Sequence, residues 1–159
     1  MELRNHLYIA LLTALSLVLF LLEGLIPLPF IAPGAKLGLA NIVTVYALFS
    51  LGPRASLLII LLRTSLASFF GGGPTIFLYS ISGGLLSLAI MTALKKTTCF
   101  SLAGISAAGG FAHHCGQLLV ASFAAQTLTI FRYLPVLGPC GLITGLMIGW
   151  LATKVKQSS

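Results

Sequence analysis

The side chains of this sequence best able to do chemistry lie in Phe111-Ala-His-His-Cys-Gly-Gln-Leu118, within the longest run without charged residues. In a membrane-spanning helix such groups must find protein partners or line a cavity, because hydrocarbon offers no hydrogen bonds. His113 and Gln117 are one helical turn apart, so we expect both to face the interior of a helix bundle. His114 points about 100° away from His113, and we expect it to have a structural role.

Two other interpretations apply to these residues. His113 and Gln117 could bond backbone or hydroxyl groups on neighbouring helices instead of a ligand. A metal site from His113, His114 and Cys115 is disfavoured, because consecutive helical residues point in different directions and the sequence has no aspartate. We therefore expect no metal and no other cofactor.

The composition is that of an integral membrane protein. Apolar residues make up 58% of the chain, charged residues only 7%, and the mean hydropathy is +1.09. Nine Lys and Arg residues outnumber two acidic ones, giving a net charge of +7, but the basic residues are scattered between apolar segments. They are typical of topology signals at the ends of spans and argue against nucleic-acid binding.

The apolar segments and their breaks predict an all-α fold with six transmembrane helices in a single domain, residues 1–159. At about 20 residues a span, six spans would use about 120 residues. We expect spans near Leu7–Ile26, Leu39–Leu51, Ala55–Phe70, Ile76–Leu94, within Phe100–Ile130 and near Leu134–Ala152. Six Lys and Arg residues then fall on the side of the termini and two on the other, which places both termini in the cytoplasm.

Polar residues from several predicted spans fall at similar depth. Arg63 and His113 lie near the middle of the membrane, and Glu23, Lys36 and Asn41 near its outer side. We expect a pocket that opens outward, with residues 33–39 as its lid and the following ligand contacts: Arg63, His113, Gln117, Lys36, Asn41 and Glu23. Alternatively, Arg63 and Glu23 form a structural ion pair, and Lys36 only marks topology.

Helix-packing and energy-source features are also visible in the sequence. Gly141, Gly145 and Gly149 lie on one helix face, which predicts tight packing, and Ala10 and Ala14 are a small pair of the same spacing.

There is no phosphate-binding loop and no aspartate to hold magnesium, so this chain is not expected to hydrolyse ATP by the P-loop arrangement. A transported solute would need its driving force from another subunit.

Several motifs resemble the Gx transporter family, which is also labelled heptaprenyl diphosphate synthase component I. They are residues 33–44, Arg63-Thr64, Gly71-Gly72, residues 79–87, His113 with Gly116-Gln117-Leu118, and residues 141–146. His114 departs from the family pattern, in which Asn is expected. The family is in turn similar to the substrate-binding S components of energy-coupling factor (ECF) importers.

This resemblance implies an S-component-like bundle in the cell membrane with an outward pocket. It implies that Ala10 and Ala14 contact a transmembrane coupling subunit, with separate ATPase subunits and a small solute or vitamin-like ligand. We expect no enzyme activity, because prenyl chain elongation binds magnesium through aspartates that this chain lacks. The alternatives are a non-catalytic membrane partner in isoprenoid or quinone metabolism or electron transfer, and a self-contained carrier or channel.

Overall fold

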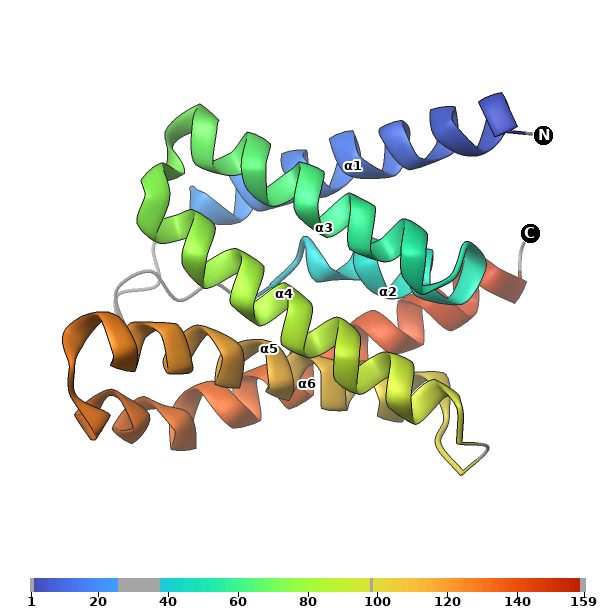
Figure 1. Ribbon diagram of the computed structural model, residues 1–159. Helices are drawn as coiled ribbons and strands as arrows, with labels where there is room; N and C mark the ends of the chain where they lie inside the picture. The colour runs from blue at the N-terminus through green and yellow to red at the C-terminus, as the bar shows by residue number, and fades with distance from the viewer. Residues whose placement is uncertain (1, 26–37, 98, 158–159) are drawn as a thin grey trace.

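The computed structural model describes residues 2–25, 38–97 and 99–157, and every regular element in these ranges is helical (Figure 1). The helices are α1 (Glu2–Gly24), α2 (Asn41–Ser50), α3 (Pro53–Ala67), α4 (Gly73–Lys95), α5 (Leu102–Ala125) and α6 (Leu134–Gln157). A π-helical turn, η1 (Ser68–Gly72), joins α3 to α4, and a 3-10 helix, η2 (Leu128–Tyr133), precedes α6. The predicted all-α class is confirmed.

Four helical stretches of the described chain are long and apolar enough to cross a membrane: Leu3–Gly24, Pro53–Phe70, Gly73–Lys95 and Leu128–Lys154. The protein is therefore a multi-pass membrane protein. α2 has 10 residues, a rise of about 15 Å, which is about half of the hydrocarbon thickness. α5 has 24 residues but carries two histidines and a glutamine, and it is not among the four. The count of six spans stays a prediction.

Several predicted boundaries differ from the observed ones. α1 begins at Glu2 rather than Leu7, and α6 continues beyond Ala152 to Gln157. A helix satisfies its own backbone hydrogen bonds, so it need not end where the apolar run ends. Gly73 has a positive φ of 64° at the start of α4, so the chain changes direction between the spans predicted near Ala55–Phe70 and Ile76–Leu94.

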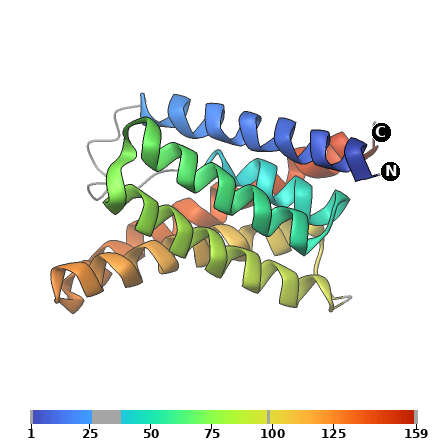
Figure 2. The same cartoon turned by 45° about the horizontal axis from the view of Figure 1, so that its top comes forward.

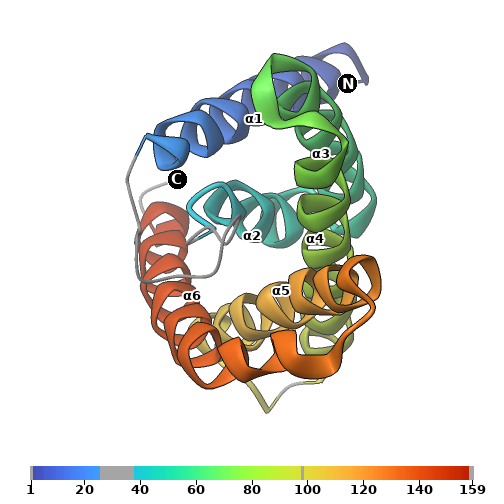
Figure 3. The ribbon, with the colours of Figure 1, turned by 90° about the vertical axis from the view of Figure 1, so that its left-hand side faces the viewer.

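The helices surround α2. Viewed toward one end, Figure 3 shows α2 inside a ring formed by the other helices, and it contacts α1, α3, α4 and α6. α1 runs alongside α3 in Figures 1 and 2, while α5 packs mainly against α4 and α6. The beginning of α1 and the end of α6 lie at the same end of the bundle (Figure 1), the arrangement expected for termini on one side of the membrane.

Glycines set the distance between α5 and α6. A methyl group at Gly145 would lie 2.5 Å from the carbonyl oxygen of Ser106, and one at Gly149 would lie 2.5 Å from Cα of Ala103. Gly141 similarly meets the backbone of Gly110. The tight packing predicted from the glycines at steps of four is therefore confirmed, and their partner is α5.

The contact between α4 and α5 is equally close. A methyl group at Gly116 would lie 2.7 Å from the carbonyl oxygen of Ser82, and the Ser82 hydroxyl donates a hydrogen bond of 3.0 Å to the Gly116 carbonyl. Backbone contact on both sides leaves α5 little freedom to rotate. This fixes the directions of His113 and His114.

Candidate functional site

His113 points from α5 toward α4. Its side chain is buried, and a methyl group at Gly83 would lie 2.9 Å from both its Cε1 and its Nδ1 atoms. Only glycine at position 83 leaves room for this imidazole. Nδ1 of His113 is buried and has no hydrogen-bond partner among the described residues.

His114 points toward α6 instead. A methyl group at Gly141 would lie 2.5 Å from Cδ2 of its ring, and its Nδ1 lies 3.2 Å from Oε1 of Gln117. The rings of His113 and His114 are nearly perpendicular, with centroids 5.9 Å apart. The buried contact of His114 agrees with its predicted structural role. Gln117 differs from expectation, because its amide oxygen pairs with His114 rather than acting alongside His113.

Arg63 lies on α3 and is 3% exposed. Its guanidinium carbon is 6.0 Å from the centroid of the Phe20 ring on α1, a distance typical of a cation–π contact. It lies close enough to both Glu23 and His113 to interact with them electrostatically. Its Nε and Nη2 atoms have no hydrogen-bond partner in the described part of the chain. The fold thus brings Arg63 and His113, which come from α3 and α5, into one region.

Glu23 has a structural task. Its two carboxylate oxygens accept hydrogen bonds from the backbone N–H groups of Gly38 and Leu39, at 2.6 and 3.0 Å. The Ser16 hydroxyl donates to the carbonyl of Ala40 at 3.1 Å. α1 therefore holds the three residues that precede α2. Spacings of three and four residues predict one shared face of α1, and this face is buried at every position: Thr13, Ser16, Phe20 and Glu23.

Asn41 begins α2 and is buried. Its Nδ2 atom lies 3.4 Å from the Ser87 hydroxyl oxygen on α4, whereas Oδ1 has no partner among the described residues. Ser87 is one turn along α4 from Gly83, which contacts His113. Asn41 and His113 therefore lie beside consecutive turns of the same helix.

Thr44, one turn after Asn41, was not predicted. It is fully buried, and its Oγ1 atom has no partner within the described ranges. The hydroxyl of Ser106, two turns before His113 on α5, is also buried and has no partner within the described ranges. The sequence carries no signal for either residue, since hydroxyls in helices usually bond the carbonyl one turn back, as Thr64 does with Ile60.

We call Asn41, Thr44, Arg63 and His113 the polar cluster. Each contributes at least one buried polar atom without a partner in the described structure. An unsatisfied buried group costs about 1–3 kcal/mol, so groups of this kind favour a partner that completes their hydrogen bonding. Arg63 offers hydrogen-bond donors, and Asn41 offers an acceptor. Thr44 and His113 can each donate or accept a hydrogen bond.

The remaining predicted residues lie elsewhere. Lys36, with most of the predicted lid, falls outside the described residues. Ala10 and Ala14 are exposed on α1, on the side away from the buried face. Within the described ranges, no group of three or more His, Cys, Asp and Glu side chains could hold a metal ion.

A family model described as heptaprenyl diphosphate synthase component I matches residues 12–155. The chain belongs to this family. The family resemblance predicted from the sequence motifs is thereby confirmed.

No curated protein is significantly similar in sequence to this member of the heptaprenyl diphosphate synthase component I family. Among solved structures, it is similar to one described as "Structure and mechanism of the S component of a bacterial ECF transporter". The TM-score is 0.72 at 17% identity, over 99% of this chain and 96% of that chain. This family member therefore has the fold of an ECF S component over nearly its whole length.

Proposed function

We propose that this protein is the substrate-binding membrane subunit of an ECF-type importer and takes up a small solute or vitamin-like cofactor. The observation that supports the proposal is the polar cluster, because each of its residues has a buried polar atom without a partner in the described part of an S-component fold. A protein that served packing alone would gain stability by replacing these residues with apolar ones of similar shape.

The polar cluster favours a particular kind of ligand. Arg63 supplies a permanent charge and two donor atoms that have no partner among the described residues, which suit an anionic or hydrogen-bond-accepting group. Oδ1 of Asn41 suits a donor on the same ligand. Lys36 and Gln117 are further proposed contacts, and Glu23 acts by holding the backbone before Asn41 as well as by its charge.

Transport would depend on partners. The exposed Ala10 and Ala14 on α1 are the proposed contact for a transmembrane coupling subunit, since small residues let a second helix approach closely. Separate ATPase subunits would supply energy, because this sequence has no phosphate-binding loop. We place the protein in the cell membrane, with α2 and α5 completing six spans and both termini in the cytoplasm.

Ligand release tests the pocket. Mass spectrometry of small molecules released from gently purified protein should identify the ligand, and Arg63→Ala or His113→Ala should lose at least about 90% of it, corresponding to about 1.4 kcal/mol or more of binding energy. Arg132→Ala is a matched control, because it removes an exposed cation outside the cluster. Unchanged ligand content in both cluster variants, with folded protein by circular dichroism, would refute the site.

Co-purification tests the partners. ATPase and coupling subunits should be retained with the wild-type chain, and Ala10→Leu with Ala14→Leu should release them while leaving ligand bound. Recovery of a prenyl synthase or redox protein instead would support the alternative role in isoprenoid or electron-transfer metabolism. Transport into liposomes that contain this chain alone would show a self-contained carrier.

A further inference from the structure

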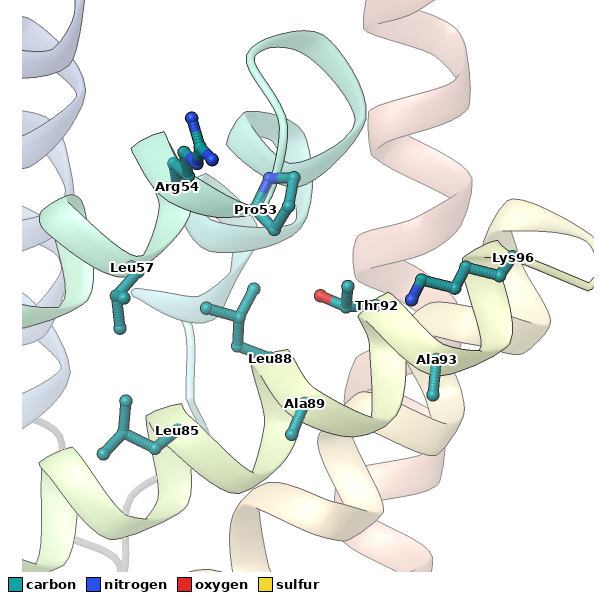
Figure 4. A pocket seen from close by; sticks show the side chains of 9 residues that line it. All are labelled: Pro53, Arg54, Leu57, Leu85, Leu88, Ala89, Thr92, Ala93 and Lys96. Carbon is teal, nitrogen blue, oxygen red and sulfur yellow. The ribbon is translucent and has the colours of Figure 1, made fainter.

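A hollow lies between the beginning of α3 and the end of α4. It has a volume of about 460 Å³ and is lined by residues of both helices (Figure 4). Arg54 and Lys96 lie on opposite sides of the hollow, where α3 begins and α4 ends, and Leu57, Leu85 and Ala89 line the part farther along the two helices. This hollow is at the opposite end of α2 from Asn41, so it is separate from the polar cluster.

The charged end of the hollow contains no acidic residue. Arg54 and Lys96 are exposed, and the only two acidic residues of the sequence, Glu2 and Glu23, are not part of the lining. Two cations on one hollow attract an anion more strongly than isolated cations do.

The start of α3 adds to this attraction. Its N-cap is Gly52, which offers no side chain to the free amides, and the first turn contains no acidic residue. A helix N-terminus carries partial positive charge, so Arg54 sits where a cation is unfavourable unless an anion is present. Lys96, by contrast, follows the end of α4, where the helix dipole favours a cation.

Thr92 belongs to the lining between Pro53 and Lys96 (Figure 4). Its hydroxyl is buried, so the contacts to a bound anion come from the two exposed cations. A phosphate oxygen is an acceptor that both cations bind.

We propose that this hollow binds an anionic phospholipid, with its phosphate between Arg54 and Lys96 and an acyl chain along Leu57, Leu85 and Ala89. A lipid is the fitting source of phosphate because the lining beyond the cations is apolar. The side chains of Leu57 and Leu85 are 39% and 40% exposed on helices able to span the membrane. Their exposed surface is therefore available to hydrocarbon rather than water.

Native mass spectrometry of the purified protein, titrated with phosphatidylglycerol or phosphatidylcholine, tests the site. The wild-type protein should retain phosphatidylglycerol preferentially. Arg54→Gln with Lys96→Gln should weaken this retention by about tenfold to thirtyfold, since each basic residue near a membrane surface contributes about 1 kcal/mol. Arg4→Gln with Lys154→Gln removes equal charge from the same end of the bundle and should retain the lipid.

A second variant separates a specific site from general surface charge. Ala89→Trp keeps both cations but fills the hollow from an exposed position, so phosphatidylglycerol retention should fall as in the Arg54 and Lys96 variant. Glycerol phosphate, which has the headgroup charge without acyl chains, should not displace the lipid. Equal retention of both lipids by the wild type, equal losses in the two double variants, full retention by Ala89→Trp, or displacement by glycerol phosphate would overturn the proposal.

Discussion

The two ends of α2 lie in contrasting surroundings. At the Leu48 end, Val45 and Leu48 are fully buried in an apolar cluster with residues such as Ile60 and Met91. The carbonyl of Leu48, near the end of the helix, accepts a hydrogen bond of 2.6 Å from Nζ of Lys95. Here the carbonyls of Ala47 and Leu48 at the helix end are paired, and the neighbouring apolar side chains are packed.

At the Asn41 end, pairing is incomplete. Glu23 and Ser16 pair with backbone groups just before the helix, yet Asn41 and Thr44 each keep a buried polar atom without a partner among the described residues. One short helix thus has a packed end that stabilises the bundle and a polar end suited to a ligand.

The largest stability effect is expected at the packed end. Leu48→Ala should lower the free energy of unfolding by about 2–5 kcal/mol, because it leaves a cavity in a fully buried site. Detergent-induced unfolding followed by circular dichroism would measure it. Leu57→Ala, at a 39% exposed position, should cost less than about 1 kcal/mol. Equal costs at both positions would remove the distinction between core and lipid-facing leucines.

An intermediate effect is expected where α1 holds α2. Glu23→Gln removes the charge from two backbone hydrogen bonds and should destabilise the protein by about 1–3 kcal/mol. Hydrogen exchange at the amides of Gly38 and Leu39 should accelerate. Ser16→Ala, which removes only the bond to Ala40, is the matched comparison and should cost about 1 kcal/mol. Unchanged exchange at residues 38 and 39 would contradict the structural task of Glu23.

The smallest stability effect is expected in the polar cluster. Thr44→Val keeps the side-chain shape and removes a buried hydroxyl without a partner, so the ligand-free protein should be unchanged or more stable by up to about 1 kcal/mol. Ligand binding should weaken by about fivefold to tenfold, the loss of one hydrogen bond. Isothermal titration against the ligand identified by mass spectrometry would measure it. A destabilised variant with unchanged binding would assign Thr44 to packing.

Some features of the site follow from the sequence, and others depend on side-chain rotamers and neighbouring helices. The burial of Glu23 and His113 follows from their spacing on helices, because residues three and four apart share a face. The partner of Gln117 did not follow, since both His113 and His114 lie within a turn of it and only the side-chain rotamers, set by the neighbouring helices, select His114. Thr44 was missed because its lack of a carbonyl partner depends on its rotamer and neighbours.

The sequence by itself determined that this chain is a membrane protein. It also determined which segments are helical and which face of α1 is buried. These properties depend on apolar composition and on local periodicity, both of which can be read directly from the sequence. Only the tertiary structure decided that α2 lies inside the bundle, that Glu23 binds the backbone before it, and that Arg63 meets His113. In lipid the hydrophobic effect does not orient one helix against another, so close glycine contacts and interhelical hydrogen bonds make that choice.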